Sequence, residues 1–169
     1  ITRDPSLMTH QPDGPWYYQQ IGLGFNYRMN DIQAALGTSQ MQRLDEYIKK
    51  RHKIATKYSQ ALDGLPVTFP YQHPDTYSAY HLYVILLNKE TTISRQNMFN
   101  KLRDHGVSVN LHYIPVHMQP YYQDMGFKNG DYSNAESYYK KTISLPMYPT
   151  LSDDDQNRVI DAVKSVLQV

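Results

Sequence analysis

Apolar side chains recur at helical spacing between residues 31 and 63, and this recurrence constrains the fold more than any other feature. The longer stripe has spacings of three, four and seven residues and comprises Leu44, Tyr47, Ile48, Ile54, Ala55, Tyr58, Ala61 and Leu62. The Asp63-Gly64 pair that follows is a typical helix end. An earlier stripe comprises Ile32, Ala35, Leu36 and Ser39. Because Leu44 is turned roughly 80° from Leu36 at about 100° per residue, we predict one long helical element with a bend within residues 40–43.

The rest of the chain alternates between strand-like and helix-like segments. Runs of aromatic and branched residues predict strands at 80–87, 107–111 and 143–145. Helices are expected at 94–105, at 119–125, at 132–141 and from Ser152 onward. The last of these has its buried stripe at Val159, Ile160, Val163, Val166 and Leu167. The predicted fold class is α/β, with a small and mainly antiparallel sheet covered by helices and preceded by a long bent linker helix.

The first 30 residues have few periodic apolar positions. They contain six helix-breaking residues, namely Pro5, Pro12, Gly14, Pro15, Gly22 and Gly24. A loop of this length in a compact domain is usually functional or disordered, so we expect it to be disordered or to reach into a neighbour. The predicted organisation is a loop over 1–30, linker helices over 31–63 and a small domain over 64–169.

Composition argues against several classes of function. The chain has 17 basic and 16 acidic residues, a net charge of +1 and no basic run, which does not favour nucleic acid or an anionic membrane as partner. No apolar stretch approaches the roughly 18 residues of a membrane span. The absence of cysteine suits a reducing compartment, so a cytoplasmic location is expected. His112 and His117 lack a carboxylate or cysteine at ligand spacing, so no metal site is predicted.

Two polar side chains stand just ahead of the first predicted helix. Asn26 and Arg28 follow a glycine-rich stretch and precede a plausible N-cap at Asn30 or Asp31. Backbone amides at a helix start carry partial positive charge and attract phosphate or carboxylate groups. The two side chains are therefore candidate donors to an anion, although an exposed arginine before a helix is often only solvated.

Residues 24–37 carry a family resemblance. Their sequence, Gly-Phe-Asn-Tyr-Arg-Met-Asn-Asp-Ile-Gln-Ala-Ala-Leu-Gly, resembles the central motif of the DegT/DnrJ/EryC1/StrS sugar-nucleotide aminotransferases, which use pyridoxal phosphate. Further resemblances follow in order at 50–55, 78–83, 111–117, 119–122 and 144–149. Within the family, Trp16-Tyr17-Tyr18 and residues 50–55 look most like the C4-aminotransferases that make UDP-4-amino-4,6-dideoxy-N-acetyl-altrosamine on the route to pseudaminic acid.

The resemblance implies that this chain is the C-terminal small domain of a fold-type I enzyme. Family members carry the lysine that forms the Schiff base in a larger preceding domain, in a Ser-Phe-x-x-x-Lys context that no lysine here shares. The chain also begins with Ile1 rather than methionine. We therefore expect a segment of a longer enzyme, in which the catalytic lysine lies elsewhere and which is inactive on its own.

The resemblance also implies roles for four residues. Asn26 matches an asparagine that reaches across a dimer interface to the cofactor phosphate of the other subunit. Arg28 would support that region or bind the substrate diphosphate, since a planar guanidinium suits bidentate binding. His112 and Tyr113 match a loop that approaches the substrate at the interface, where they would bind nucleotide phosphate or sugar hydroxyls. The alternative for His112 is a strand-end histidine bonded to backbone.

The implied activity is amino transfer from glutamate to a 4-keto UDP-sugar in surface or flagellar glycan biosynthesis, by a homodimer with shared active sites. One alternative is another C3 or C4 sugar aminotransferase of the same family. A second is a non-catalytic interaction or dimerisation module. Three further residues are read as structural: His81 as a packed, hydrogen-bonded histidine, and Arg51 and His52, on the linker helix, as bridges between the two domains.

Overall fold

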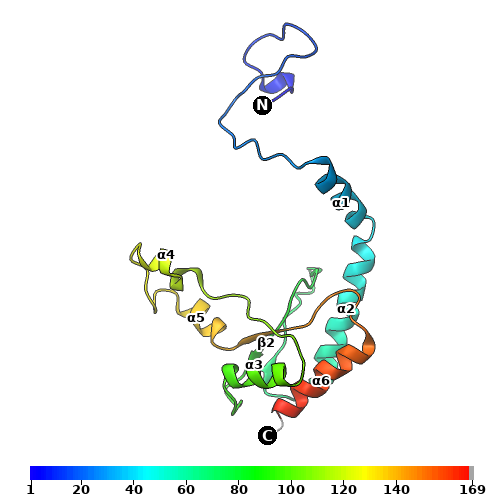
Figure 1. Cartoon of the computed structure of the whole chain (residues 1–169), viewed down its shortest axis with the longest axis vertical. Helices are drawn as coiled ribbons and strands as arrows, with labels where there is room; N and C mark the ends of the chain where they lie inside the picture. The colour runs from blue at the N-terminus through cyan, green and yellow to red at the C-terminus, as the bar shows by residue number, and fades with distance from the viewer. Residues whose placement is uncertain (168–169) are drawn as a thin grey trace. The chain divides into compact units, whose positions relative to one another are not determined.

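The structure is a computed structural model, and it describes residues 1–167 (Figure 1). The chain separates into two compact units, Ile1–Gln42 and a second unit that begins at Arg43. No helix in the described part of the chain is long and apolar enough to cross a membrane.

The first unit is organised around one buried polar side chain. After a short 3-10 helix, Pro5–Leu7, the chain returns so that Thr2 and Gln19 pair as an antiparallel bridge. The Gln19 amide accepts from the backbone N–H of Thr9 at 2.8 Å and donates to the carbonyl of His10 at 2.9 Å. The expected loop is therefore closed on itself by hydrogen bonds rather than by apolar packing.

Helix α1, Asp31–Met41, follows the loop, and Asn30 is its N-cap. Asn30 and Gln33 form a capping box, in which each side chain accepts from the other's backbone N–H. Helix α2 spans Leu44–Ala61, so the helix is interrupted at residues 42–43, within the predicted bend. None of the α1 residues is buried, whereas the α2 stripe buries Ile54, Ala55 and Tyr58.

The second unit contains a three-stranded antiparallel sheet of order β1-β2-β3, formed by β1 (Val67–Thr68), β2 (Tyr83–Leu87) and β3 (Thr142–Leu145). Strand β2 begins three residues later than predicted, because Tyr80 has a φ of 43° that interrupts extended backbone. The two-residue strand β1 was not predicted.

The strand predicted at 107–111 is wrong. Only Asn110 pairs there, as an isolated bridge to Ser144. The amide of Val107 donates to the carbonyl of Leu102, and the amide of Val109 donates to the carbonyl of Val107. These turn-type hydrogen bonds occupy the donors that a ladder would need, so the segment stays irregular beside β3.

The remaining helices are α3 (Arg95–Asp104), α4 (Pro120–Gln123), α5 (Ser133–Tyr139) and α6 (Asp153–Leu167), with a 3-10 turn at Val116–Met118. Each lies within a predicted range, and α4 and α5 are shorter than expected. The hydrophobic core lies between α2, the sheet, α3 and α6. Its fully buried side chains include Tyr58, Leu62, Tyr83, Ile85, Met98, Leu102, Ile143 and Val163.

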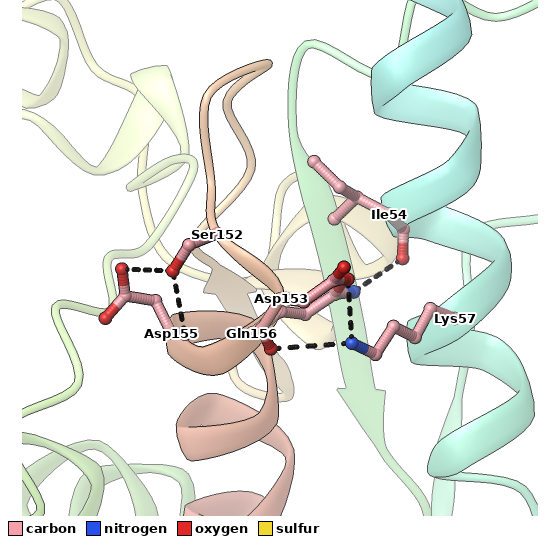
Figure 2. Close-up of polar contacts among 6 residues, drawn as sticks. All are labelled: Ile54, Lys57, Ser152, Asp153, Asp155 and Gln156. Atoms are coloured by element: carbon pink, nitrogen blue, oxygen red, sulfur yellow. Dashed lines mark hydrogen bonds and ion pairs between the residues drawn. The ribbon is translucent and has the colours of Figure 1, made fainter.

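Polar contacts fix the start of α6 against α2 (Figure 2). The side chain of Ser152 accepts from the backbone N–H of Asp155 and so caps the helix. Gln156 is buried and donates from its amide to the carbonyl of Ile54 at 2.8 Å. The Lys57–Asp153 ion pair, at 3.1 Å, is partly exposed, so solvent screens it and its contribution to stability is small beside that of the buried hydrogen bond.

Candidate functional site

Asn26 and Arg28 lie on an open turn in the first unit. Asn26 has a φ of 55°, in the left-handed region that asparagine tolerates better than most residues. The backbone N–H of Arg28 donates to the carbonyl of Asn26 at 3.1 Å, which closes the turn around Tyr27. Both side chains border an open hollow of roughly 560 Å³, together with Gly22 and Gly24. The sequence analysis paired Asn26 with Arg28 because they are close in the sequence, and in the structure both line the same hollow.

Apolar side chains alternate through the same loop, a pattern that sequence reasoning missed. Ile21, Leu23, Phe25, Tyr27 and Met29 are all exposed, and Leu23 is 100% exposed. The intervening positions are glycine or polar. In extended backbone a period of two residues places such side chains on one face. The left-handed backbone of Asn26 interrupts the extended path, so the five side chains do not form one continuous face, and all of them are exposed.

His112 and Tyr113 lie together in the second unit. Nδ1 of His112 is hydrogen-bonded to Oγ of Ser144 on β3 at 2.8 Å, so its partner is a side chain rather than the backbone. The rings of His112 and Tyr113 meet edge to face at 4.6 Å between centroids. The Tyr113 side chain is 69% exposed. The strand side chain thus orients the histidine, while the tyrosine is available to a ligand.

A buried histidine–glutamate pair follows this loop, and no sequence pattern indicated it. Nε2 of His117 and Oε1 of Glu136 on α5 are 2.8 Å apart. The backbone N–H of Gly130 donates to the same oxygen at 2.7 Å. The hydrogen bonds from His117 and Gly130 lower the pKa of the Glu136 carboxyl. His117 also borders an apolar hollow of roughly 340 Å³ with Pro115, three aromatic side chains, Val116 and Ala135.

His112 and His117 therefore have separate partners, Ser144 and Glu136. Within residues 1–167 no group of three or more histidine, cysteine, aspartate or glutamate side chains is arranged to hold a metal ion.

Arg51 and His52 hold an irregular segment against α2. Nη1 of Arg51 donates to the carbonyls of Tyr80 at 2.8 Å and of His81 and Met147 at 3.1 Å. Nε2 of His52 is 2.7 Å from the carbonyl of Ser78, and its ring stacks on Tyr77. These contacts support the structural reading of both residues.

The structural reading of His81 is wrong. Its side chain is exposed and makes no hydrogen bond among the described residues. The preceding Tyr80 has a positive φ, which turns the backbone before β2 begins.

The sequence matches the profile of the DegT/DnrJ/EryC1/StrS aminotransferase family over residues 7–164. The chain belongs to this family. It is 41% identical to the spore coat polysaccharide biosynthesis protein SpsC of Bacillus subtilis over 163 residues, which are 94% of this chain and 42% of SpsC. It is 30% identical to the UDP-4-amino-4,6-dideoxy-N-acetyl-beta-L-altrosamine transaminase of Campylobacter jejuni over 154 residues, which are 90% of this chain and 41% of that protein.

Among solved structures, DesV of S. venezuelae in complex with a ketimine intermediate has a TM-score of 0.82 and 30% identity. The match covers 92% of this chain and 41% of DesV. This likeness confirms the predicted fold class, part of an aminotransferase with a small antiparallel sheet and helices. This chain spans only about two fifths of the length of these relatives, and its match covers 42% of SpsC.

Proposed function

We propose that the full-length parent of this family member is a pyridoxal-phosphate-dependent aminotransferase that acts as a homodimer with shared active sites. In this proposal the parent transfers an amino group from glutamate to a 4-keto UDP-sugar. Family membership across residues 7–164 is the observation that carries the proposal. This segment would supply two parts of the site, the loop around Asn26 and the loop around Tyr113. The catalytic lysine would lie in the remainder of the parent.

The donors beside Asn26 fit the phosphate of the cofactor. The hollow presents an amide and a guanidinium, and none of the residues that line it is acidic. A Cβ at Gly22 or Gly24 would meet no atom of this chain within 4 Å, so internal packing does not require glycine there. Open backbone at these positions suits close approach by a phosphate. When bound, pyridoxal phosphate supplies the electron sink for amino transfer.

The side chains of this segment would bind and orient rather than exchange protons. The Asn26 amide would donate to a cofactor phosphate oxygen, and the Arg28 guanidinium would bind phosphate oxygens in a bidentate manner. His112 uses Nδ1 for Ser144, which leaves Nε2 for a sugar hydroxyl or a nucleotide phosphate. The Tyr113 hydroxyl, on an exposed ring, would bind the same ligand.

Cofactor retention tests the role of Asn26 in the full-length parent. Asn26→Gly removes the amide and keeps the left-handed backbone, which Asn26→Ala would strain. Loss of one hydrogen bond to a charged group, about 1.5–3 kcal/mol, predicts roughly 10- to 150-fold weaker cofactor binding. Asn100→Ala, which removes an exposed amide from α3, is the control. Equal cofactor affinity in Asn26→Gly and wild type would contradict the assignment.

Mixed dimers test the shared active site. A catalytic-lysine variant of the parent and an Asn26→Gly/Arg28→Ala variant are each expected to be inactive, and they are then mixed and allowed to exchange subunits. About half of randomly paired dimers are mixed and each has one intact site of two, so recovery of about a quarter of wild-type activity is expected. No recovery after proven exchange would mean that Asn26 acts within its own subunit.

Substrate comparison tests the finer specificity. The proposal places the parent with the altrosamine transaminases of the pseudaminic acid route, and the 30% identity to the Campylobacter jejuni enzyme supports it. UDP-, GDP- and dTDP-linked 4-keto sugars are each supplied together with glutamate. The highest kcat/KM is expected for the UDP-linked sugar. Preference for another nucleotide or for a 3-keto sugar would assign the parent to a different member of the family.

A further inference from the structure

Two histidines tether the loop that carries Tyr113. At its start, His112 is bonded to Ser144 on β3 at 2.8 Å, and at its end His117 is bonded to Glu136 on α5 at 2.8 Å. Between the tethers, Tyr113, Ile114 and Val116 are exposed, by 69%, 47% and 59% respectively. The exposed part of the loop is therefore presented to solvent while both of its ends are held by side chains.

The second tether is a polar pair in a region without a hydrophobic core. Between residues 112 and 141, all of which the structure describes, the buried side chains are Pro115, His117 and Glu136. None of the residues of the hydrophobic core comes from this range. In Figure 1, α4 and α5 lie together, away from α2 and α6. Besides the ring contacts of Tyr132 with His117 and Phe127, local order here rests on the hydrogen bonds of this buried pair.

Glu136 organises two segments through one oxygen atom. Its Oε1 accepts from His117 and from the backbone N–H of Gly130, so it joins the end of the loop to the turn before α5. An ionised carboxylate only accepts hydrogen bonds, so Nε2 of His117 carries the proton in this pair. The histidine ring is thereby fixed in one tautomer and one orientation.

We propose that Glu136 is a positioning residue for the sugar nucleotide: through His117 it holds the loop between the two tethers in the conformation that presents Tyr113 to the ligand. This inference rests on the proposed function, because it assumes that His112 and Tyr113 bind the sugar nucleotide. Glu136 does not contact the ligand in this account, and its effect is exerted through the loop.

Kinetics of the full-length parent test the proposal. Loss of a well-placed hydrogen bond to a charged ligand group weakens binding roughly 10- to 100-fold, so Glu136→Ala should raise the KM for the keto sugar by about that factor and change kcat much less. Glu136→Gln retains an oxygen that can accept both hydrogen bonds, and its KM should stay within about 3-fold of wild type. Glu90→Ala, an exposed glutamate outside this region, is the control.

A second measurement separates positioning from general destabilisation. Hydrogen exchange of the Gly130 amide reports directly on Oε1 of Glu136, and it should become faster in Glu136→Ala and remain slow in Glu136→Gln. If Glu136→Ala does not fold, His117→Phe keeps a ring beside Tyr132 while removing the tether, and it should raise KM in the same way. A wild-type KM in the folded variant that lacks the tether would overturn the proposal.

His112→Ala distinguishes this inference from the proposed function. If His112→Ala weakens binding of UDP while Glu136→Ala and His117→Phe leave KM unchanged, the positioning role is wrong and the proposed function stands. If neither His112→Ala nor Tyr113→Phe weakens binding of UDP or turnover of the keto sugar, the loop does not bind the sugar nucleotide. That result overturns the inference together with this part of the proposed function.

Discussion

The two units of this chain differ in how they use apolar side chains. Every buried hydrophobic residue among residues 1–167 lies between Ile54 and Val166, in the second unit. In the first unit the only buried side chain is Gln19, while Leu23, Phe25 and Ile32 are exposed by more than four fifths. Helices α1 and α2 both carry apolar stripes, yet only the stripe of α2 is buried in a core. The comparison teaches that an apolar helical stripe does not by itself show that the helix is packed within its own unit.

Matched leucine substitutions should give the largest difference between the units. Leu102 is 0% exposed and Leu23 is 100% exposed. Leu102→Ala should lower the free energy of unfolding by about 3–5 kcal/mol, because it leaves a cavity in the core. Leu23→Ala should change it by less than about 0.5 kcal/mol. Urea denaturation of the 169-residue chain measures both, and similar losses would break the comparison.

Matched arginine substitutions should differ by less. Arg51 donates to three backbone carbonyls, whereas the Arg28 side chain has no hydrogen bond among the described residues. Arg51→Ala should lower the free energy of unfolding by about 1.5–3 kcal/mol. Arg28→Ala should leave it unchanged, whatever it does to ligand binding. Equal urea-denaturation midpoints for Arg51→Ala and wild type would show that water can replace Arg51 as the hydrogen-bond donor to the three carbonyls.

Alkaline pH should weaken the second unit through its buried tyrosines. Burial raises the pKa of Tyr83 to about 12, while the ordinary value is 10.0. Because the folded pKa is the higher one, this contribution to stability is complete below pH 10 and is lost as the pH rises through 12. Denaturation at pH 9, 11 and 12 should show a shallower decline for Tyr83→Phe than for wild type. Parallel declines would mean that Tyr83 ionises equally in both states.

Helix caps should give the smallest effects and separate local from global stability. Ser152 caps α6 and Asn30 caps α1, each by accepting from a backbone N–H. Ser152→Ala should lower the free energy of unfolding by about 1 kcal/mol. Asn30→Ala should reduce the helix content of residues 31–41 without changing that free energy, because α1 buries nothing. An equal shift in the urea midpoint for both variants would contradict this difference.

Much of the second unit could be predicted because its signals are local. The α2 stripe and the interruption near residue 42 follow from the spacing of apolar residues, and the start of α6 at Ser152 follows from residue type. The strand at 107–111 was wrong, because β propensity does not indicate that turn-type hydrogen bonds take up the amides of Val107 and Val109.

Only part of the candidate site could be predicted from the sequence. The motif around Asn26 located a hollow, but the alternating apolar side chains from Ile21 to Met29 were missed in a loop that was expected to be disordered or to reach into a neighbour. The His117–Glu136 pair joins residues 19 positions apart through α5, so no local pattern indicates it. The roles of Asn26, Arg28, His112 and Tyr113 stay predictions, since they concern a cofactor and substrate.

Native-state hydrogen exchange of the 169-residue chain tests the central claim most directly, namely that the second unit is stabilised by its own core and the first unit is not. Amides in β2, β3 and α6 should exchange only through global unfolding, with opening free energies equal to that from urea denaturation. Amides in α1 should exchange far faster, through local opening. Protection in α1 equal to that in α6 would contradict the account, because it would show that residues 1–42 unfold only with the core.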